Sequence, residues 1–118
     1  MKTFVMMTKI APHDADIIDI TNKMKRHTRN SPARIEEIQR KCPEVKFLAH
    51  FALLGPYDFM DVYEAPDERT AAAVSLLSRA YGAFQIESWT AIPCKDIADV
   101  VPGFCPEDVE EPLDITAD

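Results

Sequence analysis

The residues best suited to chemistry are His50 and Asp61, which stand on either side of a predicted tight turn at Gly55-Pro56. If Leu54 pairs with Tyr57 across that turn, each outward step keeps the sum of the two residue numbers constant. His50 then faces Asp61 on one side of a two-stranded ladder. A carboxylate beside an imidazole orients the ring as a general base requires. This pair therefore predicts acid–base chemistry.

The same alternation adds further candidates to this side of the sheet. Glu87, on a later apolar segment, would supply a second acid–base group. Aromatic rings would line a ligand there, and the candidates are Tyr57, Phe59, Tyr63 and Trp89. An alternative interpretation stays open, in which these polar groups form only a hydrogen-bonded cluster that holds the register of a dimer core.

The elements that must position these side chains can be read from apolar periodicity and from Pro and Gly. Strands are expected at 3–10, 45–54, 57–64 and 83–92, and helices over roughly 13–42 and 67–81. His13 or Asp14 would cap the first helical segment, and a second start at Ser31-Pro32 predicts two helical pieces or one kinked helix. Asp67 is the expected N-cap of the later helix, and Gly82 its C-cap glycine.

This order of elements, βαββαβ, predicts an α+β fold: a ferredoxin-like unit with a four-stranded antiparallel sheet. Both sides of the 45–64 hairpin are largely apolar, so both need cover. Two helices cover one side. We expect the sheet of a second subunit to cover the other side, which holds His50 and Asp61 and would be the interior of a dimeric barrel.

The block Gly55-Pro56-Tyr57-Asp58, followed by Glu64-Ala65-Pro66-Asp67, resembles the GYD-domain family. The resemblance implies membership of the dimeric α/β-barrel group, built on a ferredoxin-like unit, and it implies no particular reaction. Tyr57 and Asp58 match the family's own motif. Tyr57 is either a turn residue that packs its ring or a functional residue, whereas Asp58 is expected to satisfy backbone N–H groups.

Charge and composition limit the possible partners. The net charge is −7, which argues against nucleic acid, yet eight of the 13 basic residues fall within residues 23–46. That basic segment is either a solvated helix face or a local anion site. His13, Asp14, Asp16 and His27 do not share a helical face, so no metal site is expected. No long apolar run or signal peptide is evident, so we expect a cytoplasmic protein that does not enter membranes.

Two regions and three functions follow. Residues 1–100 are expected to form the GYD-like domain, and residues 101–118 an acidic, Pro-rich tail. The first function is a small-molecule-binding or sensor-type homodimer, or higher homo-oligomer, with a small apolar or aromatic ligand. The alternatives are a cofactor-poor monooxygenase or isomerase that uses the His–Asp pair, and an assembly protein. The sequence names no cofactor and does not decide whether the protein is an enzyme.

Overall fold

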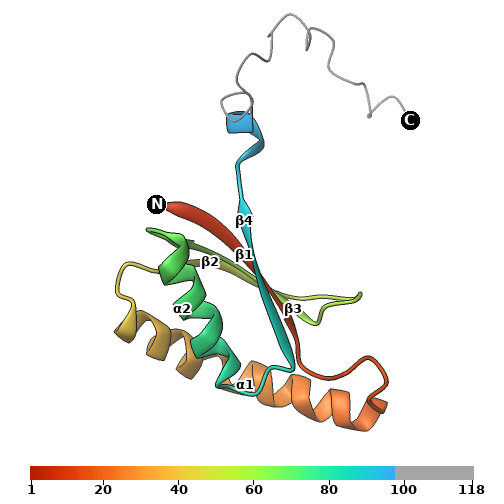
Figure 1. Cartoon of the computed structure of the whole chain (residues 1–118). Helices are drawn as coiled ribbons and strands as arrows, with labels where there is room; N and C mark the ends of the chain where they lie inside the picture. Colours follow the sequence, from red (N-terminus) through yellow and green to blue (C-terminus); the bar gives the residue numbers. More distant parts are fainter. Residues whose placement is uncertain (98–118) are drawn as a thin grey trace, which may run out of the picture.

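The computed structural model describes residues 1–97, which form the predicted βαββαβ unit. Its elements are β1 (Lys2–Lys9), α1 (Ile17–Lys41), β2 (Lys46–Ala52), β3 (Phe59–Ala65), α2 (Glu68–Arg79), β4 (Gln85–Ala91) and a 3-10 turn, η1 (Cys94–Asp96). The strands form one antiparallel sheet in the order β2-β3-β1-β4. Both helices lie against one face of this sheet (Figure 1). The ferredoxin-like α+β fold is confirmed, and the expected tail, 101–118, lies outside the described residues.

Helix α1 is one continuous helix, and the alternative of two separate helical pieces is wrong. It begins after Asp16, two residues beyond the expected cap, where the Asp16 carboxylate accepts a hydrogen bond from the backbone N–H of Asp19 at 2.9 Å. Pro32 lies inside the helix on its exposed side, so the backbone bond that proline removes is lost where water can replace it. The helix therefore continues through Pro32.

The pairing of β2 with β3 follows the predicted register near the site. His50 pairs with Asp61, and Ala52 with Phe59. A bulge between Phe47 and Ala49 then shifts the ladder, so that Phe47 pairs with Tyr63. The expected pairing of Leu48 with Tyr63 is wrong, because the extra residue of the bulge moves Phe47 to the helix-covered face.

The turn between these strands is longer than the Gly55-Pro56 pair. Strand β2 ends at Ala52 and β3 begins at Phe59, while the backbone N–H of Leu53 donates to the carbonyl of Asp58 at 2.9 Å. Gly55 has no positive φ, and a Cβ added to it would meet nothing within 4 Å. The glycine at this turn is therefore not required by its backbone conformation.

The predicted caps of α2 differ in outcome. Asp67 is the N-cap, as expected, and its carboxylate accepts hydrogen bonds from the backbone N–H and the hydroxyl of Thr70 at 2.8 and 2.7 Å. The helix ends at Arg79, with Ala80 as C-cap, earlier than predicted. Gly82 has φ +94°, a backbone conformation that is strained for residues with a side chain, and it leads the chain into β4.

The two faces of the sheet differ in cover. The core lies between the sheet and the helices and contains Phe4, Met6, Ile38, Val45, Tyr63, Ala65, Ala71 and Val74. We call the opposite side the open face. Cross-strand pairing places Val5, Phe51, Met60, Val62 and Trp89 there. Phe51 and Trp89 are 52% and 47% exposed, so this face presents large apolar side chains to solvent.

Candidate functional site

His50 and Asp61 are brought together as the register predicts. His50 Nδ1 lies 2.8 Å from Asp61 Oδ1, on facing positions of β2 and β3. Asp61 is completely buried, while the His50 side chain is 29% exposed at the edge strand. The carboxylate therefore fixes the orientation of the imidazole.

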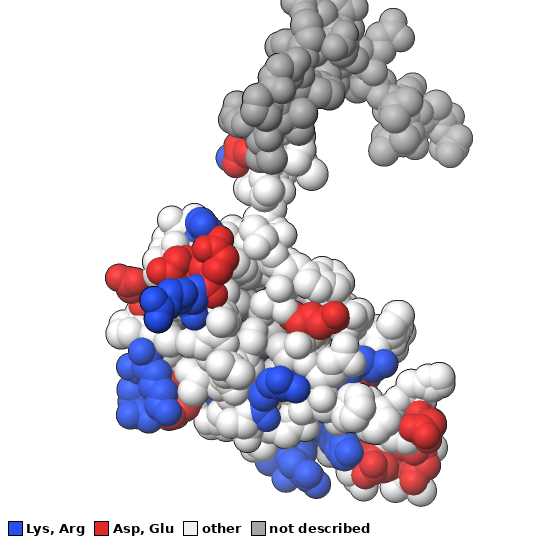
Figure 2. Space-filling model, in the orientation of Figure 1, with Lys and Arg blue, Asp and Glu red and all other residues white. Residues whose placement is uncertain are grey.

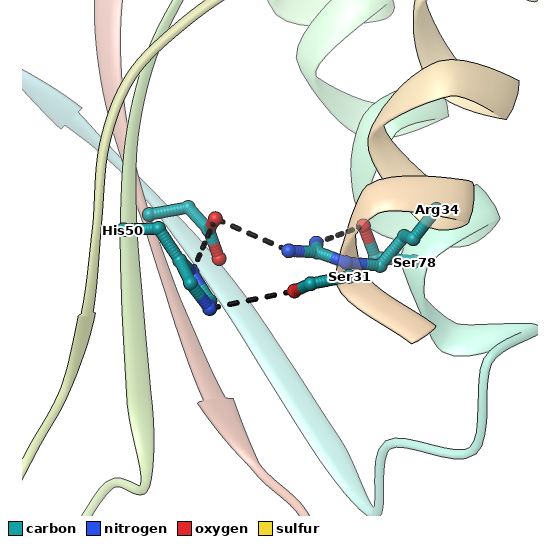
Figure 3. Close-up of polar contacts among 5 residues, drawn as sticks. Ser31, Arg34, His50 and Ser78 are labelled. Carbon is teal, nitrogen blue, oxygen red and sulfur yellow. Dashed lines mark hydrogen bonds and ion pairs between the residues drawn. The ribbon is translucent and has the colours of Figure 1, made fainter. Parts of the chain in front are cut away.

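The environment of the pair differs from the prediction. We expected His50 and Asp61 in the interior of a barrel, on the face away from the helices. They lie on the helix-covered face, where Ser31 and Arg34 of α1 reach them (Figure 3). Both sides of the hairpin are apolar, so hydropathy does not distinguish the side that the helices cover. The prediction chose the wrong one.

Arg34 connects three elements at this point. Its Nη2 lies 3.2 Å from Asp61 Oδ1, and its Nη1 donates to Ser78 Oγ at 3.2 Å. Arg34 is 1% exposed and Asp61 0%, so this is a fully buried ion pair between α1 and β3. Removing one partner of such a pair leaves an uncompensated charge and typically costs about 3–5 kcal/mol. The contact therefore ties both helices to the sheet.

Ser31 completes a linear arrangement of three polar groups (Figure 3). Its Oγ lies 3.5 Å from His50 Nε2, and His50 Nδ1 contacts Asp61, the order of a Ser–His–Asp triad. The serine is buried in the middle of α1, and 3.5 Å is at the outer limit of a hydrogen bond. We call Ser31, Arg34, His50, Asp61 and Ser78 the polar cluster.

His27 extends the polar cluster along α1. Its ring stacks on Phe59 with centroids 4.1 Å apart and lies 5.8 Å from the ring of His50. Burial lowers the pKa of His27 to about 4, and the neighbouring Arg34 and His50 side chains add to the effect. His27 is therefore neutral near pH 7, and in this state its ring packs against the neighbouring aromatic side chains.

The other site candidates divide between the two faces. Phe59 and Tyr63 are buried under the helices, where the Tyr63 hydroxyl lies 3.3 Å from Ser88 Oγ. Glu87 pairs with Met7, and this puts its side chain on the open face. The prediction that Glu87 and Trp89 face the same side as His50 is therefore wrong. The alternate residues of β4, including Ser88, are the ones that face the helices.

Tyr57, Glu87 and Trp89 form a second group on the open face. The Tyr57 hydroxyl donates a hydrogen bond to the Glu87 carboxylate, and this bond raises the pKa of Tyr57. The rings of Tyr57 and Trp89 meet edge to face, with centroids 5.9 Å apart. A carboxylate held by a tyrosine thus lies among apolar side chains that are open to solvent.

Asp58 has the structural role expected of it. Its Oδ2 accepts a hydrogen bond from the backbone N–H of Ile10 at 2.9 Å, and its own N–H donates to the carbonyl of Thr8 at 2.8 Å. These two bonds hold the β2–β3 turn against the end of β1. A cleft of about 360 Å³ lies beside this junction, lined in part by Lys9, His13 and Gly55.

None of Ser31, Arg34 and Ser78 was predicted as a site residue, and Ser31 was expected to begin a second helical piece. Arg34 was counted within a basic segment, but the buried positions of α1 recur every three or four residues and place it in the same stripe as Ser31 and Ile38. That spacing was the available signal: a polar residue in a buried helical stripe needs a partner on the sheet.

Comparison with known proteins establishes the family of this chain. The GYD domain profile matches residues 4–101, and the chain belongs to the GYD domain family. A Thermus thermophilus protein, "Glutamine synthetase and cystathionine beta-lyase binding protein", is 29% identical over 100 residues, which cover 82% of this chain and 95% of the relative. A solved structure, "crystal structure of FFRP-DM1", is 15% identical with a TM-score of 0.46, covering 78% of this chain and 100% of that one.

Neither helix of residues 1–97 has the length and apolar character to cross a membrane. In that same part of the chain, no group of three or more His, Cys, Asp or Glu side chains is arranged to hold a metal ion.

Proposed function

We propose that this protein is a homodimeric, regulatory binding protein that acts by associating with a metabolic enzyme. In this proposal the open faces of two subunits pack against each other as a dimeric α/β barrel. The polar cluster then holds α1 and α2 on the sheet and carries out no reaction.

The observation that carries the proposal is the apolar character of the open face. Phe51 and Trp89 are about half exposed on its two edge strands, and Val5, Met60 and Val62 lie on the central strands between them. Exposed apolar patches of this kind mark protein interaction sites. A second copy of the same sheet offers a complementary, self-matching surface.

The proposed association with a metabolic enzyme is supported by the relative from Thermus thermophilus. The Thermus thermophilus protein is named for binding glutamine synthetase and cystathionine beta-lyase, and its match with this chain extends over 95% of its length. The burial of Ser31 favours the same direction, because a nucleophile must be reachable by its substrate.

The dimer is tested by sedimentation equilibrium with two matched variants. Phe51→Glu puts a charge on the open face, and Phe84→Glu makes the same change at a residue of almost equal exposure, 52% against 53%, outside that face. We expect a dimer for the wild type and Phe84→Glu, and a monomer for Phe51→Glu at micromolar concentration. A monomeric wild type, or equal behaviour of the two variants, contradicts the proposed interface.

Enzyme binding is tested by titrating purified glutamine synthetase and cystathionine beta-lyase, from the source of this chain, onto the immobilised wild-type protein. We expect saturable binding of one of them. Absence of binding to both refutes the regulatory half of the proposal and leaves the dimer unaffected.

A second candidate function is an enzyme in which His50 activates Ser31, and the order Ser31–His50–Asp61 is the observation that favours it. A fluorophosphonate probe reacts with activated serines and needs no known substrate. We expect intact-mass analysis to show no adduct, because Ser31 is buried in α1. Labelling of Ser31 that is lost in His50→Gln would establish the enzyme instead.

A further inference from the structure

A small cleft lies beside His27, and its lining includes no member of the polar cluster or of the Tyr57–Glu87–Trp89 group. It has a volume of about 50 Å³ and is lined by Ile10, Lys23, Arg26, His27, Tyr81 and Gly82. One water needs roughly 10–15 Å³ on this scale, and sites for drug-sized ligands measure about 300–1,000 Å³. The cleft is therefore of a size for a small polyatomic ion, or for the end group of a larger molecule that extends into solvent.

The charges at this cleft are positive. Lys23, Arg26 and His27 are spaced so that they share one face of α1. Arg26 has no ion-pair partner within residues 1–97, and Lys23 Nζ has only a distant one, Asp19 Oδ2 at 3.5 Å. On the side drawn in Figure 2, Lys and Arg side chains lie along the edge that α1 forms, and Asp and Glu side chains gather at one end of this edge. An anion is therefore the ligand that this cleft favours.

The imidazole of His27 provides independent support. It is only 8% exposed, and its Nε2 has no hydrogen-bond partner in the described part of the chain. Buried polar atoms of folded proteins are nearly always hydrogen-bonded, so an unpartnered one calls for a missing partner. The Nε2 atom itself is enclosed by protein atoms, so a ligand oxygen in the cleft would become its partner only after a small movement of the surrounding side chains.

We propose that this cleft binds a small oxyanion, inorganic phosphate or the phosphate group of a small metabolite, through Arg26, Lys23 and His27. The guanidinium group binds two phosphate oxygens through its parallel N–H donors, and the ammonium adds a second positive charge. The proposal goes beyond the binding of an enzyme and does not depend on it. It gives a regulatory protein a place to sense a phosphorylated metabolite.

Anion binding has a signature in the titration of His27. The groups that face this ring are Arg34 and His50, which lower its pKa, and Asp61 and Asp58, which raise it. A bound anion favours the imidazolium form, and by linkage the pKa of His27 must rise when the site fills. Chloride at the same ionic strength does not reproduce this change, because it does not match the donors of the guanidinium group.

The experiment is an NMR titration of the His27 ring with inorganic phosphate at constant ionic strength. We expect a saturable shift and a higher pKa for the wild type, and at least a tenfold loss of phosphate affinity for Arg26→Gln. Arg29→Gln is the matched control, since Arg29 is an exposed arginine of the same helix that does not line the cleft. It should bind phosphate like the wild type.

Three outcomes would overturn the proposal. The first is equal phosphate affinity for Arg26→Gln and Arg29→Gln, which would mean general attraction to a basic helix. The second is a response to phosphate that chloride reproduces at equal ionic strength. The third is equally tight binding of acetate, which would refute the assignment to phosphate. Each is measured on the full chain and is independent of dimerisation and of enzyme binding.

Discussion

Acid should destabilise this protein through a single buried histidine, His27. Its pKa is lowered to about 4 in the folded state, from the ordinary value of 6.5, chiefly by burial. Between pH 6.5 and pH 4 His27 is therefore protonated in the unfolded chain and neutral in the folded chain. Because the unfolded state binds the additional proton, the free energy of unfolding falls as the pH falls through this range. The two pKa values give a loss of about 2 kcal/mol between pH 7 and pH 5.

Urea denaturation of the wild type and of His27→Gln at pH 7 and pH 5, in phosphate-free buffers, measures this effect. Glutamine keeps a polar group at the site but does not titrate, so the variant should lose about 2 kcal/mol less than the wild type between the two pH values. Taking the difference between the proteins removes the contributions of all other titrating groups that the substitution leaves unchanged. An equal pH dependence for both proteins would refute the reasoning about His27.

Three further predictions concern stability in thermal or urea unfolding. Arg34→Met should cost about 3 kcal/mol, because it leaves the charge of Asp61 buried without a partner. Asp61→Asn should cost much less in the Arg34→Met variant than in the wild type, because the two charges form a buried pair. Additive losses would contradict the pairing. Gly82→Ala should cost about 1 kcal/mol because of its positive φ, while Gly55→Ala should be nearly neutral. Asp67→Ala should cost about 1 kcal/mol through loss of the α2 N-cap; an unchanged midpoint would show that the cap contributes nothing.

The sequence predicts the pairing of His50 with Asp61 because register depends on local information. A turn near Gly55 and the period of two along each strand are enough to bring the two residues opposite each other. The bulge at Leu48 could not be predicted in the same way, because a bulge is favoured by tertiary packing and leaves no clear signal in an apolar segment. The error begins at that residue and does not affect the site.

The face on which the site lies could not be predicted from hydropathy. Both sides of the β2–β3 hairpin carry aromatic and aliphatic residues, so neither side is marked as the one that the helices cover. The decisive information is in α1, where Arg34 and Ser31 share the buried stripe with Ile38. A buried arginine requires a carboxylate, and Asp61 is the buried carboxylate on the facing strand.

The most direct test of the central claim, that two open faces pack together, is an isotope-filtered NOE experiment on a mixture of labelled and unlabelled subunits. Met60 lies on a central strand of the open face, and its methyl group is a suitable probe. The account predicts intermolecular NOEs from the Met60 methyl to open-face side chains such as Val5 or Trp89 of the other subunit. Intermolecular NOEs confined to the helices, or none from Met60 in a sample that is dimeric by sedimentation, would contradict it.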